Sequence, residues 1–135
     1  MTSLLRIAAA ATLLVTVASG ARADVLCAAP PPAPGAVVRG PVLHVRDGET
    51  LCVALGATPD LWLPMRLAQT TPGPPALAPS PTRGALMSVA FGEMVDCRLE
   101  SVTPQGAIAT CTHQGRSIAQ AARDPAALAA GRAWR

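Results

Sequence analysis

The stretch VLHVRDGETLCVAL, from Val42 to Leu55, decides the fold of this chain. Two runs rich in apolar residues flank Asp47-Gly48, and this pattern is a strong short-range signal for a tight β-hairpin turn. The turn also brings two carboxylates, Asp47 and Glu49, to one end of a sheet. They are open to two interpretations: turn residues with no further role, or the start of an acidic metal site.

The first 23 residues have the features of a secretory signal peptide. Arg6 precedes an apolar run, and Ala21-Arg22-Ala23 is a small-residue cleavage site. At about 12 residues the apolar run is short for a bilayer span, so cleavage after Ala23 is favoured over a retained anchor. The sequence therefore predicts an exported protein, periplasmic or secreted, with no membrane span after cleavage.

Residues 24–135 are enough for one domain with a modest core. They carry nine arginines and eight acidic residues, a net charge of about +1, so there is no strong basic footprint for nucleic acid. Lys and Tyr are absent and Phe91 is the only phenylalanine, which leaves Trp62 and Trp134 as candidate base-stacking residues. Packing in or beside the core is the competing role for both tryptophans.

Four cysteines in an exported chain predict two disulfides. The run MVDCRLESVTPQGAIATCT reads as two strands joined by a turn, which places Cys97 opposite Cys111. Cys27 then pairs with Cys52 and ties the N-terminal arm to the first hairpin. A metal site is the rival interpretation, but the lack of Cys-x-x-Cys spacing argues against zinc.

The spacing of apolar residues and of helix and strand breakers predicts a mainly β fold with helices. Residues 24–36 form a proline-rich extended arm, and Pro64 indicates an edge or a bulge in its strand. Ser80-Pro81 has the form of a helix start and Gly92 that of a helix end. The expected strands are Val37–Val45, Thr50–Leu55, Leu61–Ala68, Met94–Glu100 and Ala107–Thr112, and the tail from Ile118 to Trp134 is expected to be helical in pieces, broken before Pro125. Five strands with these helices predict a small five-stranded barrel of the OB type.

The order of these motifs resembles the thermonuclease family, the staphylococcal-nuclease-like domains. In that family a strand ends in Asp-Gly-Asp-Thr and the next strand carries Val-Arg-Leu. An Asp-x-Pro-Glu loop, a helix, a hairpin with Tyr-Gly-Arg and a C-terminal helix follow. Here HVRDGETLCV and MRLA resemble the first two motifs, GEMVDCRL and QGAIATCTHQGRSIAQ the hairpin and the segment after it, and LAAGRAW the closing helix. The resemblance covers Val37 to Trp134 and implies a staphylococcal-nuclease-like OB-fold domain over residues 37–135.

The resemblance also implies a site, in which carboxylates hold Ca²⁺, a glutamate activates water and two arginines bind the phosphate. Asp47, Thr50 and Arg66 keep the residues of the family pattern. Glu49 replaces the metal-binding aspartate of the turn and is one methylene longer. Asp47 and Glu49 are therefore the candidate Ca²⁺ ligands, and Arg66 is the candidate catalytic residue.

The other positions of the family site are changed. Aligned on Pro72, Thr71 replaces the second ligand aspartate and Gly73 the catalytic glutamate, and Ala107 replaces the second arginine. General-base catalysis contributes about 10² to 10⁴ in rate, and a phosphate-binding arginine about 10³ or more in related chemistry. Losing both predicts little or no nuclease activity.

Arg66 and three further basic residues have a structural and a functional interpretation. Arg66 lies in an apolar strand and would be costly to bury alone, so we expect Asp47 or Glu49 to pair with it. His44 is expected to face solvent, His113 lies near a turn, and Arg116 is a solvated charge or a substitute for the lost arginine.

Three functions remain from the sequence. The first is a non-catalytic, monomeric binding module whose partner is a nucleic acid or an envelope protein. The second is a divergent calcium-dependent nuclease acting on DNA or RNA. The third is a structural or inhibitory envelope domain.

Overall fold

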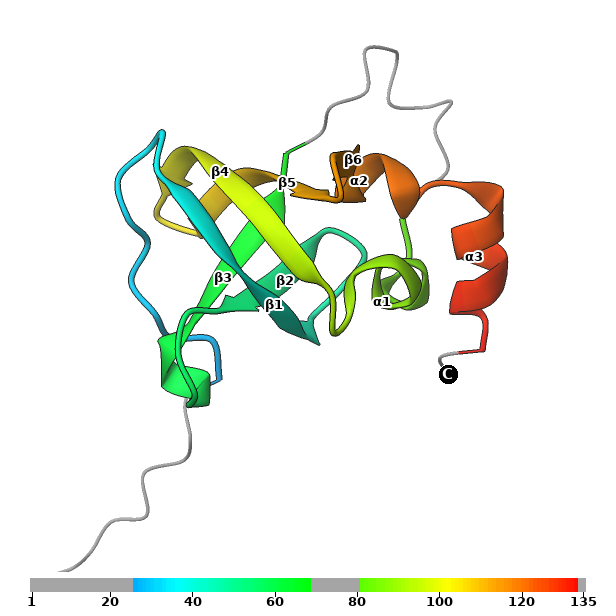
Figure 1. The fold of residues 1–135 in the computed structure, drawn as a ribbon, viewed down its shortest axis with the longest axis horizontal. Coiled ribbons are helices and arrows are strands. Elements are labelled where there is room, and N and C mark those ends of the chain that lie inside the picture. Colours follow the sequence, from blue (N-terminus) through cyan, green and yellow to red (C-terminus); the bar gives the residue numbers. More distant parts are fainter. Residues whose placement is uncertain (1–25, 69–80, 134–135) are drawn as a thin grey trace, which may run out of the picture.

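The computed structural model describes residues 26–68 and 81–133, which form a mixed β-barrel with its α-helices at one end (Figure 1). The predicted signal peptide, residues 1–23, lies outside the described residues, as do Thr71, Gly73 and Trp134. The elements are β1 (Val37–Val45), β2 (Thr50–Ala54), the 3₁₀ helix η1 (Pro59–Leu61), β3 (Trp62–Leu67), α1 (Arg83–Ala90), β4 (Met94–Thr103), β5 (Gly106–His113), β6 (Arg116–Ser117), α2 (Ile118–Ala121) and α3 (Pro125–Gly131).

Five strands close into the barrel, which confirms the predicted mainly β fold with helices and its five-stranded barrel. The sheet has the order β3-β2-β1-β4-β5-β6, and β3 also pairs with β5 in parallel. This last pairing, from Met65 with Ala107 to Leu67 with Ala109, joins the edge strand β3 to β5 and closes the barrel. The first half of β1 pairs with β4 and its second half with β2. A Cβ on Gly40 would lie 2.3 Å from the carbonyl oxygen of Ala54. Glycine therefore allows β1 and β2 to approach closely where the partner of β1 changes from β4 to β2.

The predicted strands and helices are found within a few residues of their expected bounds. Pro64 pairs with Cys52 on β2 and lies just before the β3–β5 pairing begins, which is where a residue without an N–H fits. Two elements were missed, η1 and the two-residue strand β6. Both are too short to produce a periodic pattern in the sequence.

The hairpin of β1 and β2 is confirmed, and its link lies where the predicted strands place it, after Val45 and before Thr50. Residues 46–49 link the strands, and the N–H of Arg46 donates to the carbonyl of Thr50 at 2.9 Å. Gly48 is not among the glycines with positive φ. A Cβ on Gly48 would instead lie 2.1 Å from the carbonyl oxygen of Pro81. Glycine is needed here because the chain leading into α1 passes directly against this link.

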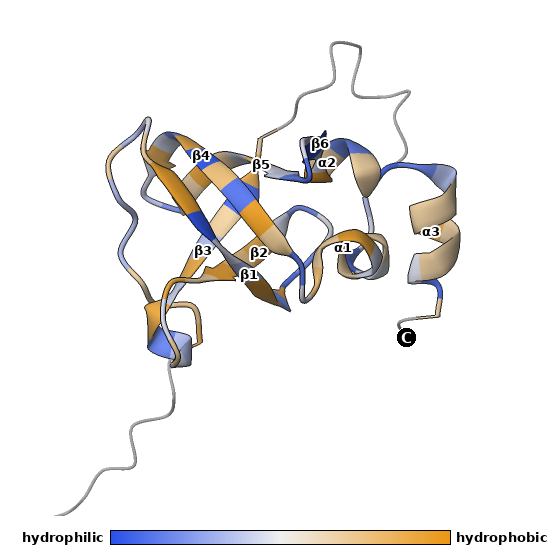
Figure 2. Cartoon of the chain, viewed as in Figure 1, coloured by the Kyte–Doolittle hydropathy of each residue, from blue (hydrophilic) through white to orange (hydrophobic). Residues whose placement is uncertain are grey.

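The core fills the barrel interior and extends under α1. Along β4, Val95, Cys97 and Leu99 are at most 1% exposed and alternate with exposed residues, as expected for a strand with one buried face. Figure 2 shows the same alternation of hydrophobic and hydrophilic positions along β4. Leu86 and Ala90 of α1 are fully buried and belong to the same core cluster.

Both predicted disulfides are present. Cys97 and Cys111 are direct partners in the β4–β5 register, with Cα atoms 4.0 Å apart. Cys27 and Cys52 connect the N-terminal arm to β2, with Cα atoms 6.0 Å apart. No cysteine is free, so the thiolate metal site is wrong. Two disulfides in a domain of this size are consistent with an extracytoplasmic location.

Within residues 26–68 and 81–133, no helix has the length and apolar character that a membrane crossing requires.

Candidate functional site

The link between β1 and β2 holds both acidic candidates. Asp47 Oδ1 accepts a hydrogen bond from the N–H of Glu49 at 2.9 Å, so the aspartate side chain shapes the link. The carbonyl of Glu49 accepts from the N–H of Leu67 at 2.7 Å, which holds the link against the end of β3. The carboxylate of Glu49 is thereby positioned beside Arg66.

Arg66 lies on the outer face of the barrel and pairs with Glu49. Its nearest strand neighbours are Thr50 on β2 and Ile108 on β5. Arg66 Nη2 donates to Glu49 Oε2 at 2.9 Å, which confirms the expected ion pair. The Arg66 side chain is 61% exposed, so its guanidinium is also accessible from solvent.

A second arginine, which the sequence did not reveal, approaches the same carboxylate. Arg123 lies between α2 and α3, and its Nη2 is 3.8 Å from Glu49 Oε1. Its side chain is only 13% exposed, and its Nη1 donates to the carbonyl of Ala119 at 3.5 Å. Its Nε is buried without a hydrogen-bond partner. In the sequence, Arg123 is visible only as a basic residue after the alanine-rich segment from Ala119 to Ala122. That pattern does not predict which side chain the arginine contacts.

Glu49 therefore lies between two guanidinium groups, one on each carboxylate oxygen. Calcium prefers six to eight oxygen ligands, with several carboxylates among them. The described residues contain no group of three or more His, Cys, Asp or Glu side chains that could hold a metal ion. Two positive charges beside the carboxylate also oppose a divalent cation. The described part of the site fits an ion-pair cluster better than a calcium site.

Ala107, which the resemblance aligns with a phosphate-binding arginine, faces the barrel interior. It is 2% exposed, lies in β5 next to Met65 of β3, and belongs to the core cluster. An arginine with this orientation would bury its charge among apolar side chains. The substitution Ala107→Arg would therefore disturb the core.

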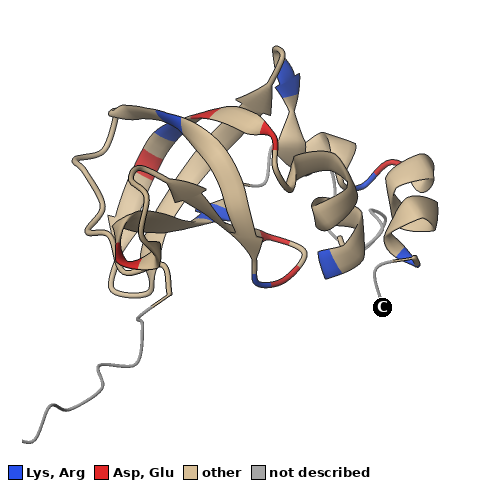
Figure 3. Ribbon diagram, turned by 60° about the horizontal axis from the view of Figure 1, so that its bottom comes forward, with Lys and Arg blue, Asp and Glu red and all other residues tan. Residues whose placement is uncertain are grey.

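A second group of basic residues lies near Val45, at the β1 end of the link. Arg83, at the start of α1, donates from Nε to the carbonyl of Val45 at 2.9 Å. His44 is half-buried rather than solvent-facing, which corrects the expectation for this residue. Burial lowers the pKa of His44 below its ordinary value of 6.5, and the charges of Arg83 and Arg46 lower it further. Figure 3 shows basic and acidic positions close together around this link.

The remaining candidates have local partners. His113 Nδ1 lies 2.8 Å from the carbonyl oxygen of Met94. Arg116 pairs with Asp124, the residue before α3, so its charge has a nearby partner. Trp62 is half-buried with a buried Nε1, which fits packing rather than base stacking.

The chain matches no protein-family model, and no curated protein matches it.

Proposed function

We propose that this barrel is a degenerate staphylococcal-nuclease-like domain that acts outside the cytoplasm as a non-catalytic binding module for nucleic acid. The order of motifs along the chain supports the family, and the five-stranded mixed barrel is compatible with it. The two disulfides support the location.

One observation carries the non-catalytic part of the proposal. The carboxylate of Glu49 is engaged by Arg66 and Arg123, where the family site would need carboxylates directed at a metal. A carboxylate neutralised by two guanidinium groups contributes little to cation binding. With Ala107 in the core, the second phosphate-binding arginine has no equivalent at this position.

Local charge supports an anionic partner. Four arginines surround the β1–β2 link, against the two carboxylates of Asp47 and Glu49. These arginines are Arg46, Arg66, Arg83 and Arg123. A site with such an excess of positive charge attracts phosphate groups in a salt-dependent way, although the chain as a whole has little net charge. A nucleic acid satisfies this requirement and agrees with the family resemblance.

The test combines binding and cleavage on the same material. Fluorescence anisotropy of a labelled single-stranded oligonucleotide should show saturable binding that weakens as salt increases. Arg66→Ala and Arg83→Ala should each weaken binding, while Arg98→Ala, at an exposed position of β4, should not. Addition of Ca²⁺ should cause no cleavage and no rise in melting temperature.

Two results would contradict the proposal in different ways. Calcium-dependent cleavage that Arg66→Ala abolishes would establish the divergent nuclease. Failure to bind any oligonucleotide at low salt would remove nucleic acid as the partner and leave the structural or inhibitory domain.

A further inference from the structure

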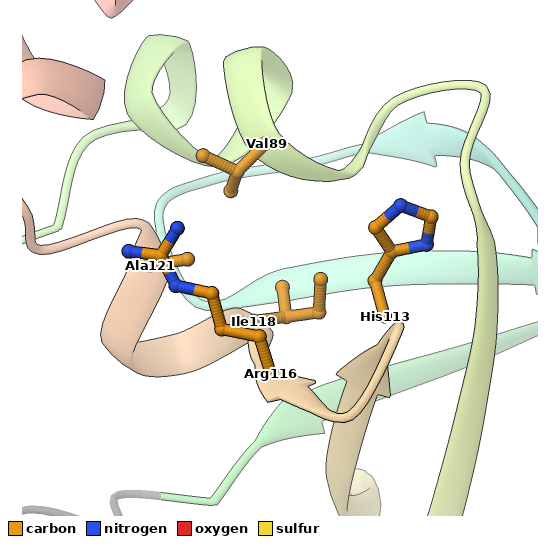
Figure 4. A pocket seen from close by; sticks show the side chains of 5 residues that line it. All are labelled: Val89, His113, Arg116, Ile118 and Ala121. Carbon is orange, nitrogen blue, oxygen red and sulfur yellow. The ribbon is translucent and has the colours of Figure 1, made fainter.

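A pocket of about 210 Å³ lies between α1 and the segment that runs from β5 through β6 into α2. Among the described residues, those that line it are Val89, His113, Arg116, Ile118 and Ala121. Figure 4 shows Val89 pointing from α1 toward Ile118, with His113 and Arg116 at opposite ends. The pocket is separate from the Arg66–Glu49–Arg123 cluster, since none of these three residues lines it.

The walls of this pocket are mostly apolar. Val89 is half-buried on α1, while Ile118 and Ala121 of α2 are 2% and 6% exposed. The His113 ring is held in place from outside the pocket, because Nδ1 lies 2.8 Å from the Met94 carbonyl oxygen and Nε2 lies 3.4 Å from Glu93 Oε2. With these polar atoms directed to partners, His113 adds a flat, fixed wall at one end.

Arg116 supplies the charged group at the other end. One of its terminal nitrogens contacts Asp124, but the guanidinium carries five N–H groups in a planar fork. The side chains of Arg116 and Asp124 are 68% and 46% exposed, and an ion pair this exposed is weak. A ligand carboxylate can therefore share the guanidinium or replace Asp124 as its partner.

The pocket is partly open to solvent, so its volume sets the size of the part of a ligand that it can enclose. An apolar cavity of about 150 Å³ holds one benzene molecule, so about 210 Å³ accommodates one ring together with a small polar group. An apolar body with one charged group is also the usual composition of a ligand for a pocket with apolar walls and a single polar anchor.

We propose that this pocket binds a small aromatic carboxylate, with the ring between Val89 and Ile118 and the carboxylate at Arg116. The proposal does not depend on nucleic-acid binding at the β1–β2 link. It assigns this end of the barrel a small-molecule site of its own.

The test is a titration of the disulfide-bonded protein with benzoate, followed by ¹H–¹⁵N NMR. Benzyl alcohol and benzylamine, at matched ionic strength, serve as neutral and cationic probes with the same ring. Saturable shifts centred on residues 87–91 and 113–121 are expected for benzoate. Benzyl alcohol should bind roughly tenfold more weakly, the loss of one charge-assisted hydrogen bond, and benzylamine should not bind.

Two variants with matched controls locate the site. Arg116→Gln should weaken benzoate binding about tenfold, while Arg98→Gln on the barrel surface should leave it unchanged. Val89→Trp should fill the pocket and abolish binding, while Val37→Trp, at a position that is 66% exposed, should have no effect. Circular dichroism checks that each variant is folded.

The possible outcomes are distinct. Equal binding of benzoate and benzyl alcohol, with no effect of Arg116→Gln, would overturn the carboxylate specificity. Preferential binding of benzylamine would overturn the sign of the ligand charge. Absence of saturable shifts, or shifts that persist in folded Val89→Trp, would overturn the site itself.

Discussion

At the scale of single residues, Glu49 has the largest number of structural roles in the described site. Its backbone holds the β1–β2 link against β3, and its carboxylate pairs with Arg66 and Arg123. The two pairs differ in burial, because Arg66 is 61% exposed and Arg123 only 13%. Exposed pairs contribute little, whereas a buried charge without a partner is costly. Glu49 therefore stabilises the fold mainly through Arg123.

This difference predicts the effect of removing the charge of Glu49. Glu49→Gln should lower the free energy of unfolding by about 1–3 kcal/mol, because it leaves the buried guanidinium of Arg123 without its counter-charge. Arg66→Ala should cost less than about 1 kcal/mol. Urea unfolding monitored by circular dichroism measures both.

Asp47→Asn is the matched control, since its amide oxygen can still accept the hydrogen bond from the N–H of Glu49. It should change stability by only a few tenths of a kcal/mol. An equal loss in Asp47→Asn and Glu49→Gln would contradict the role given to Arg123.

His44 makes stability depend on pH. Its folded-state pKa lies below 6.5, so the unfolded chain binds this proton more readily. The contribution of His44 is complete above the unfolded pKa and is lost as the pH falls through the folded pKa. The melting temperature of the wild type should therefore fall more steeply than that of His44→Gln between about pH 7 and pH 5.

The lowered pKa of His44 can also be checked directly. Arg83→Gln removes one of the charges that lower the pKa of His44, so NMR titration of the imidazole should show a higher pKa in this variant. If the melting temperatures of the wild type and His44→Gln change equally with pH across this range, the folded state does not disfavour the charged imidazole.

At the scale of elements, α1 and α3 contact each other at two glycines, Gly84 and Gly131. A Cβ on Gly84 would lie 2.1 Å from the carbonyl oxygen of Gly131, and a Cβ on Gly131 would lie 2.3 Å from the N of Ala85. Both contacts are with backbone atoms, which cannot rotate away. The two helices can approach this closely only because neither has a side chain at the crossing.

Substitution at the crossing should separate the helices. Gly131→Ala is expected to destabilise the protein by about 1–3 kcal/mol, the usual cost of overpacking. Ala130→Ser, at an exposed position of the same helix, should stay within about 0.5 kcal/mol of the wild type. Thermal unfolding compares them, and a neutral Gly131→Ala would show that α3 can shift without loss of packing.

At the scale of the whole molecule, the barrel and the C-terminal helix differ in how they are held. The barrel is closed by strand pairing and contains both disulfides, whereas α3 packs chiefly on α1. Local opening follows such differences in packing. Figure 1 shows α3 beside α1 and away from the strands.

Hydrogen exchange should therefore separate the two regions. Amides of α3 are expected to exchange well before those of β1, β4 and β5, and Gly131→Ala should accelerate exchange in α3 without changing β4. Equal protection of α3 and β4 would mean that the helix opens only with the barrel.

The sequence by itself determined the local elements and the covalent links. Strand alternation, proline and glycine positions and the hairpin register are local patterns, and they were sufficient to predict five strands, three helical segments and both disulfides. The exception was Gly48. Glycine is needed at this position because the backbone of Pro81 approaches it closely, and not because of the conformation of the turn.

Only the tertiary structure decided how the candidate site is composed. Arg123 approaches Glu49 because the helices fold back against the β1–β2 link, and Ala107 is buried because β5 pairs with β3 as the barrel closes. Neither relation follows from spacing along the chain, since both depend on elements that meet only after closure. The opening stretch thus predicted the hairpin, and the packing around it determined that Glu49 lies between two arginines.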